Sequence, residues 1–441
     1  MKFLILSFCL LLLPAMLQAK VSYDINDPDV VAQVGELTLS PQLIEIFWRA
    51  YNHPSRPITP PQAMQRIVDD ALLADYARSH LSTEKLSEEN QVGFLVAVQQ
   101  QDRATALLRK FFEKPLYQAI KQLPGGSLDG AFQLSDAINS DWLKQHFSLQ
   151  SKVRIEATLA QIERAKQTTL ATLTFDGEQQ PLTLWDIYQR QNVQGRLALL
   201  SSDYKYLVAQ VRQRVGSLFV LHWAEKNMSA RDYRTVFQVI RNEHDKTTLL
   251  KNMGLYADVH DDNPVLREKA TQVSEAEILA FYKEHKDEFE VVEKVKARHI
   301  RLTSQQQADA VHNEIKQGMA FEDAVKKYSV ADDKHKKPAG DLGWLKRKDK
   351  DRSWLHAVAF TQPEGAVSMP FRSPQNAGEI VYEILYIDER VDGYLPVSDP
   401  TVRYEASRDV ALETLKAEFF QLQNRLRQQA DISLNRKALQ R

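Results

Sequence analysis

Alternating strand and helix patterns dominate the segment from Val295 to Arg390. Residues 295–302 are predicted as a strand, and residues 380–387 form an apolar run in which Glu383 is the exception. Such a run is typical of a strand covered on both faces. Between the two strands, apolar positions three and four residues apart predict helices at 304–318 and 321–328. The segment is therefore predicted to be an α+β domain with a small antiparallel sheet.

The preceding part of the chain has mostly helical patterning. Residues 30–39 predict a hairpin that turns at Gly35, and residues 91–122 predict one long helix. In the helix around Ile67, Asp69 and Asp70 are expected to face water. A similar hairpin and helix near residue 172 suggest an internal repeat of 30–80 in 172–227, with chance similarity equally open.

The last helix carries an apolar stripe at alternating steps of three and four residues. This stripe spans only about two heptads, so we expect it to pack back on the N-terminal helices rather than to form a coiled-coil dimer. The stripe consists of Leu412, Leu415, Phe419, Leu422 and Leu426.

The first residues have the pattern of a secretory signal peptide. Lys2 precedes an apolar run from Phe3 to Leu13, and small residues follow near Ala19. The run is too short to span a bilayer as a helix, although an uncleaved anchor is the alternative. Cys9, the only cysteine of the chain, lies inside this run. The mature chain would have no thiol, which suits an oxidising compartment, and we predict the bacterial periplasm.

Composition and charge exclude several classes of protein. With 441 residues the chain is expected to form two or more domains. A formal net charge of −1 gives no electrostatic footprint for nucleic acid. The scattered histidines have no metal-ligand spacing, and no Gly-x-Ser-x-Gly motif is present. We therefore expect no metal, no nucleic acid and no hydrolase chemistry.

Three motifs in the 295–390 segment resemble a known family. They are Arg298-His299-Ile300, the bend Gly340-Asp341-Leu342-Gly343-Trp344, and Phe360-Thr361-Gln362-Pro363-Glu364-Gly365. At this spacing they resemble a parvulin-type (PpiC-like) peptidyl-prolyl cis-trans isomerase domain. The whole layout resembles periplasmic folding factors of the SurA, PpiD and PrsA type. The resemblance implies a helical chaperone-like domain at 20–290 after the signal at 1–19, a parvulin-like domain at 291–390, and a closing loop and helix at 391–441.

The resemblance also implies a site without any cofactor. His299 matches the first histidine of the family, and Asp332, with Asp333 next, is expected at the acidic position. The apolar clamp for the proline ring would include Leu342, Phe360 and Met369, together with either Trp354 or Leu355.

The chain departs from the family at the second histidine. Family members usually carry Gly-aromatic-His before the last strand, whereas here Glu379 and Ile380 follow Gly378, and a shifted alignment gives Tyr382. Two functions are therefore open. The first is a periplasmic isomerase and chaperone, of weakened activity, that acts on extended exported polypeptides and proline-containing peptides. The second is a parvulin-like binding protein without catalysis.

Overall fold

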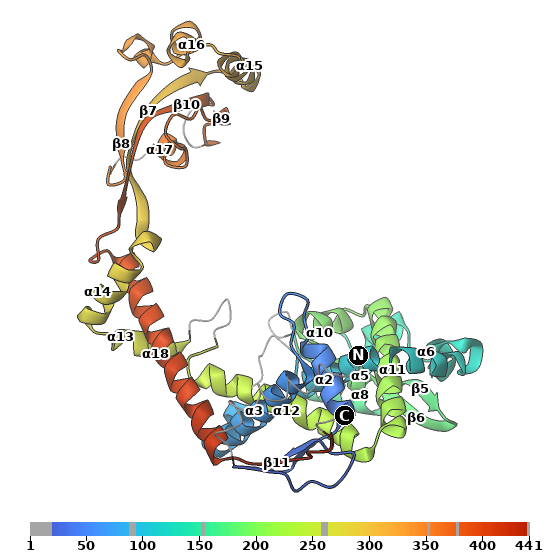
Figure 1. The fold of residues 1–441 in the computed structure, drawn as a ribbon. Helices are drawn as coiled ribbons and strands as arrows, with labels where there is room; N and C mark the ends of the chain where they lie inside the picture. The colour runs from blue at the N-terminus through green and yellow to red at the C-terminus, as the bar shows by residue number, and fades with distance from the viewer. Residues whose placement is uncertain are drawn as a thin grey trace, which may run out of the picture. The chain divides into compact units, whose positions relative to one another are not determined.

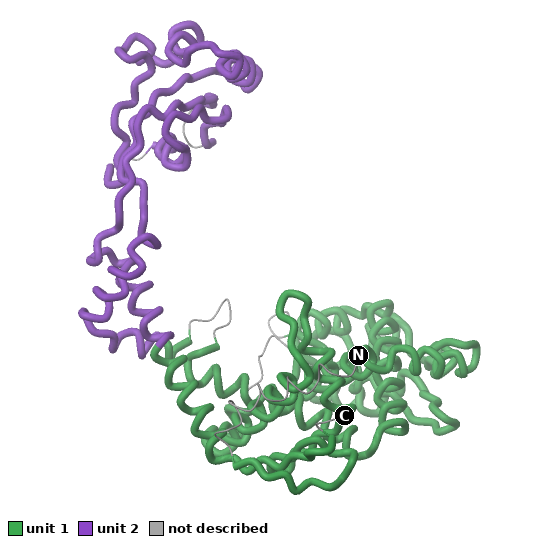
Figure 2. Tube along the Cα trace, in the orientation of Figure 1, with its two compact units in different colours: residues 1–266, 414–441 green, residues 267–413 purple. Residues whose placement is uncertain are grey.

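The computed structural model describes residues 20–87, 94–150, 155–256, 263–350, 353–375 and 379–438. The predicted signal segment at 1–19 and Gly378 lie outside these ranges. The chain forms two compact units (Figure 2): unit 1 comprises residues 1–266 and 414–441, and unit 2 comprises residues 267–413. None of the helices in the described ranges combines the length and the apolar character needed to cross a membrane.

Unit 1 is mainly helical, with two small sheets (Figure 1). Its helices are α2 (Pro41–Tyr51), α3 (Pro60–His80), α4 (Thr83–Leu86), α5 (Val96–Phe111), α6 (Glu113–Lys121), α7 (Ser140–His146), α8 (Leu159–Gln167), α9 (Leu184–Tyr188), α10 (Val193–Leu200), α11 (Tyr204–Asn227) and α12 (Ala230–Asn252). Its strands are β1 (Lys20–Ser22), β2 (Ala32–Val34), β3 (Leu37–Leu39), β4 (Phe132–Leu134), β5 (Thr169–Phe175), β6 (Glu178–Thr183) and β11 (Asp431–Leu434).

The predicted N-terminal hairpin is confirmed. Strands β2 and β3 pair antiparallel, and Gly35 takes a φ of +53° in the turn, where glycine has no Cβ penalty. Strand β11, from the far end of the chain, lies between β1 and β2; it is parallel to β1 and antiparallel to β2. The two ends of the described chain thus share one sheet.

Helix α3 corrects one expectation about charge. Asp69 and Asp70 were expected in water, but both are buried. Arg427 donates to both oxygens of Asp69, at 2.7 and 2.5 Å, and Lys246 donates to Asp70 at 2.9 Å. These partners come from helices distant in sequence, so a local pattern of polar positions could not distinguish burial with a partner from exposure.

The predicted helix at 91–122 is divided into α5 and α6. The break falls at Phe112, just before Pro115. Proline has no N–H and its ring clashes with the carbonyl four residues earlier, so one continuous helix is disfavoured here. The second predicted hairpin is present as β5 and β6, turning at Asp176 and Gly177. That this hairpin begins an internal repeat stays a prediction.

Unit 2 is built around a four-stranded antiparallel sheet with the order β8-β7-β10-β9. The predicted α+β class is confirmed. The longest pair, β7 and β10, forms the centre of the sheet (Figure 1). The elements of this unit are α13 (Pro264–Thr271), which crosses the unit boundary, α14 (Glu275–Glu284), β7 (Glu290–Leu302), α15 (Gln305–Lys316), α16 (Phe321–Tyr328), β8 (Asp341–Lys346), α17 (Trp354–Ala359), β9 (Phe371–Arg372) and β10 (Tyr382–Tyr394).

Each face of this sheet has its own apolar cluster. On one face Ile300, Leu302 and Ile384 pack against side chains of α15 and α16. On the other face Ala297 and Leu385 pack against side chains of α17. Helix α18 (Pro400–Gln429) begins in unit 2 and ends in unit 1, where Phe419, Leu422 and Leu426 contact apolar residues of α3 and α12.

Candidate active site

His299 lies on β7, on the sheet face that packs against α17. Its direct partner across the ladder is Leu385, and the neighbouring pairs are Ala297 with Ile387 and Arg301 with Glu383. Directly paired residues of an antiparallel sheet project from the same face, and so do residues two apart on one strand. Alternation along these two strands therefore places His299, Arg301 and Glu383 beside the apolar cluster around α17.

The imidazole of His299 is held between two carboxylates. Its Nδ1 is 2.7 Å from Oε2 of Glu383, and its Nε2 is 2.8 Å from Oδ2 of Asp333. Arg301 Nε donates to the other oxygen of Glu383 at 2.6 Å. The side chain of Glu383 is 0% exposed, and His299 as a residue is 2% exposed. Because both ring nitrogens of His299 are hydrogen-bonded to carboxylates, the imidazole can polarise its surroundings but is not free to act as a nucleophile or a base.

The loop after α16 brings Asp333 to the histidine. Val330 N–H donates to the carbonyl of Arg301, and His299 N–H donates to the carbonyl of Gly340, so both ends of the loop are fixed to β7. Gly340 N–H also donates to the carbonyl of Asp333 at 3.0 Å. Asp332, the first choice from sequence, is exposed, and Asp333, the second choice, is the aspartate that contacts His299.

Asp333 is the less completely held of the two carboxylates. Its Oδ1 is buried and accepts no hydrogen bond from the described residues, whereas both oxygens of Glu383 are bonded. A buried acceptor without a donor is costly, so Asp333 is the member of the cluster with the most to gain from a new donor.

The environment shifts the pKa of His299 upward. Burial on its own lowers the pKa, but the hydrogen bond and charge of Glu383, with those of Asp333, outweigh burial and raise the pKa above the usual 6.5.

We expect an NMR titration of the histidine Cε1–H resonances to give His299 a midpoint above 6.5, with His299→Asn identifying the resonance. A midpoint at or below that value would contradict the cluster. Because folding raises this pKa, the stabilisation is complete below about pH 6.5 and declines as the pH rises through the folded pKa.

Partly exposed apolar side chains lie next to the charged cluster. Leu342, Trp354, Phe360 and Phe371 are half-buried and pack against the cluster that contains Leu385. The rings of Trp354 and Phe371 meet edge to face, with centroids 5.4 Å apart. These four side chains form what we call the apolar shelf.

The remaining predicted clamp residues differ in exposure. Met369 is 67% exposed, so its side chain is available to a ligand. Leu355 is only 6% exposed and belongs to the core, which leaves Trp354 as the more accessible of the two alternatives. The assignment of any of these residues to a proline clamp stays a prediction.

Three residues of this region were not chosen from the sequence. Glu383 had a visible signal, since it interrupts an apolar run, but the family's second histidine was expected near Gly378 or Tyr382. Glu383 directly follows Tyr382, the residue given by the shifted alignment. Arg301 and Phe371 carried no local signal, because their roles depend on pairing across the sheet.

The chemistry available here is that of binding and polarisation. No three of the His, Cys, Asp and Glu residues in the described ranges gather in an arrangement that could hold a metal ion. The cluster combines an imidazole, a guanidinium and two carboxylates, next to side chains that can cover an apolar ring. A bound peptide bond would be partly removed from water and placed in a fixed electric field.

Comparison with known proteins identifies this part of the chain. Residues 273–397 match the family described as PPIC-type PPIASE domain, so this segment is a parvulin-type domain. The foldase protein PrsA of Bacillus subtilis (strain 168) is 32% identical over 80 residues, which is 18% of this chain. That match spans only 27% of the length of PrsA.

Solved structures of similar proteins were also found. A structure of the SurA-like chaperones PEB4 and Cj1289 of Campylobacter jejuni is 19% identical and covers 51% of this chain and 83% of its own, with a TM-score of 0.21. PrsA from Bacillus subtilis is 17% identical, covering 55% and 90%, with a TM-score of 0.19. Foldase protein PrsA from Lactococcus lactis is 9% identical, covering 93% and 96%, with a TM-score of 0.20.

Proposed function

We propose, taking the parvulin-type character of residues 273–397 as the premise, that this protein is a peptidyl-prolyl cis-trans isomerase and chaperone that assists the folding of exported proteins. One observation carries the proposal. The cluster of His299, Glu383 and Asp333 lies on the same sheet face as the apolar shelf.

Prolyl isomerisation suits a site without a free nucleophile. The barrier of about 18–20 kcal/mol arises from amide resonance, so a catalyst needs only to bind the twisted peptide bond more tightly than the planar one. The shelf would hold the pyrrolidine ring, and the polarised imidazole of His299 would support the field around the rotating amide. Asp333, one oxygen of which accepts no hydrogen bond from the described residues, would be the group that responds to a peptide N–H.

The cellular setting is proposed from the first residues of the chain. The charged start and short apolar run at 1–19 support export to the periplasm, with an uncleaved anchor as the alternative. The clients would be unfolded or extended exported polypeptides, bound by unit 1 and by the parvulin-type domain, whose limits we propose at 291–390.

A second function is favoured by Glu383. The chain has no histidine at the positions considered for the family's second histidine, and Glu383, which follows Tyr382, is bonded to both His299 and Arg301. A cluster closed in this way could recognise peptides without accelerating rotation. The protein would then be a parvulin-like chaperone with weak or absent catalysis.

A protease-coupled isomerase assay on purified residues 20–441 tests the first function. We expect measurable acceleration over the uncatalysed rate, and we expect Met369→Ala to lower kcat/KM by about threefold to tenfold, because about one to two buried methylene equivalents are lost on binding. Leu279→Ala removes a comparably apolar exposed side chain from α14 and should leave kcat/KM unchanged.

The outcomes separate the two functions. A wild-type rate equal to background would reject the isomerase. Suppression of aggregation of an unfolded client by the same preparation would then support the chaperone without catalysis. Equal effects of Met369→Ala and Leu279→Ala would reject Met369 as part of the peptide-binding surface.

A further inference from the structure

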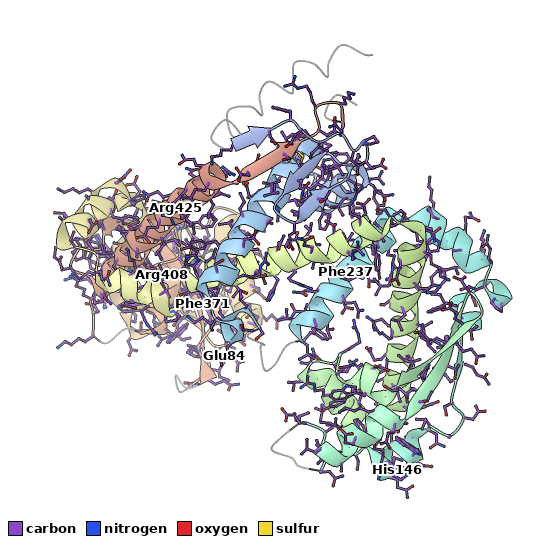
Figure 3. The ribbon with its side chains drawn as sticks, turned by 90° about the horizontal axis from the view of Figure 1, so that it is seen from below. Glu84, His146, Phe237, Phe371, Arg408 and Arg425 are labelled. Carbon is purple, nitrogen blue, oxygen red and sulfur yellow. The ribbon has the colours of Figure 1, made fainter. Side chains whose placement is uncertain are left out.

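A second region that could hold a ligand lies in unit 1. Two adjoining cavities, of about 200 and 370 Å³, share Arg190 and Arg214 in their linings. Arg190 follows α9, and Arg214 lies on α11, which contacts α5. Phe237, marked in Figure 3, lines the larger cavity from α12. The region is therefore built by three long helices and the end of a short one.

The charges that line this region do not balance. Among the described residues that line the two cavities, the three guanidinium groups of Arg190, Arg214 and Arg241 stand against two carboxylates. Asp102 already accepts from Arg190. Asp186 is held in its own capping box, where it accepts from the N–H of Thr183 at 2.8 Å and from its hydroxyl at 2.7 Å. The described lining residues therefore carry one positive charge in excess, which favours a ligand of opposite sign.

Arg214 has a buried donor that is not in use. Arg190 and Arg214 both donate to Oε1 of Gln101, at 2.5 and 2.9 Å, so the two lone pairs of this oxygen are in use. Nε of Arg214 is buried and has no acceptor among the described residues. Burial, followed by the nearby charge of Arg190, lowers the pKa of Arg214 to about 10. An anion between these arginines would accept the unused donors and relieve the repulsion between them.

The rest of the lining indicates what is attached to the anion. Amide side chains suited to a peptide backbone line both cavities: Gln191, Gln210 and Gln213 in the smaller, and Gln100, Gln101 and Gln189 in the larger. Gln191 is buried and fixed, because its Oε1 accepts from Tyr206 at 2.6 Å and its Nε2 donates to the carbonyl of Ile187 at 3.0 Å. Leu95, Val98 and Phe237 add an apolar wall in the larger cavity.

We propose that Arg190 and Arg214 form a binding site for a carboxylate of a polypeptide client. The amides beside them would bond the adjoining backbone, and the wall around Phe237 would take an apolar side chain. This inference depends on the proposed function only because it takes a polypeptide as the ligand. The carboxylate can be the free C-terminus of a chain or an acidic side chain, since both present the same two oxygens to a guanidinium.

Binding of three fluorescent decapeptides of one apolar sequence to purified residues 20–441 tests the site. The first ends in a free carboxylate, the second in an amide, and the third in an amide preceded by glutamate. We expect the amide to bind about tenfold more weakly than one or both of the acids, as loss of a charge-assisted contact implies. The stronger of the two acids identifies the source of the carboxylate. Equal affinity for all three peptides would overturn the proposal.

Two variants of α11 locate the contact. Arg214→Gln should abolish the preference for the acid, whereas Arg212→Gln, which removes the same charge from an exposed side chain 3.5 Å from Asp129, should preserve it. The same loss in both variants would assign the preference to net charge and overturn the site. If Arg214→Gln fails to fold, the wild-type comparison still decides.

The readout is independent of isomerisation. A chain that discriminates acid from amide while lacking isomerase activity supports the carboxylate site and rejects the proposed enzyme. A chain that accelerates isomerisation without discriminating the peptides does the reverse.

Discussion

Glu383→Ala is expected to lower the free energy of opening of β7 and β10 by about 3–5 kcal/mol, the range found when one partner of a buried ion pair is removed. The substitution leaves the buried His299 with one carboxylate and leaves Arg301 without the acceptor 2.6 Å from its Nε. Hydrogen exchange of peptides covering 290–302, measured in the whole chain, reports this local stability without assuming that two units unfold together.

Glu389 provides the matched control for this experiment. It lies on the same strand, is 55% exposed and pairs with Lys296 at 3.2 Å. Exposed pairs of this kind contribute about 0–1 kcal/mol, so Glu389→Ala should leave the exchange of β7 nearly unchanged. If the two variants differ by less than about 1 kcal/mol, the charged cluster does not stabilise the sheet in the way described.

Gly340→Ala should also destabilise unit 2 strongly. A Cβ at this position would lie 2.4 Å from the carbonyl oxygen of His299 and 3.1 Å from a methyl carbon of Val325. The backbone φ of +73° is itself unfavourable for alanine, by about 1–2 kcal/mol. Because the close neighbour is backbone, relief requires β7 to move, and we expect a total loss of about 3–4 kcal/mol.

Gly343→Ala separates the two contributions. Gly343 has a similar φ of +70°, but a Cβ there would meet nothing within 4 Å. It should therefore cost only the backbone term, about 1–2 kcal/mol, in the same exchange measurement. Equal losses at the two positions would show that the close approach of residue 340 to His299 carries no energetic weight.

The sequence predicted those elements whose signals are local. The helix predicted at 304–318 is present as α15. Ser304 caps its first turn by accepting from the N–H of Gln307, and Gly318, just past its end, has a φ of +109°. The apolar run at 380–387 predicted the central strand β10. These signals depend on neighbours within about one helical turn, and for that reason they could be read directly.

The parts that the sequence did not reveal depend on distant partners. The local sequence around Asp69 is typical of a surface position, and its burial depends on the contact with Arg427, which is distant in the sequence. The choice between Asp332 and Asp333 turns on where the anchored loop points, and that is set by hydrogen bonds to His299 and Arg301. The role of Glu383 follows from its pairing with Arg301 on the neighbouring strand. The periodicity of apolar residues along one strand carries no information about that pairing.

The position of β11 between β1 and β2 sets an order of events during synthesis. Unit 2 is a continuous stretch, whereas unit 1 needs residues 414–441 to complete its first sheet. As the chain leaves the ribosome from its N-terminus, residues 267–413 are all available before β11 exists. The sheet of unit 1 therefore cannot be completed until residues 431–434 are available to join β1 to β2.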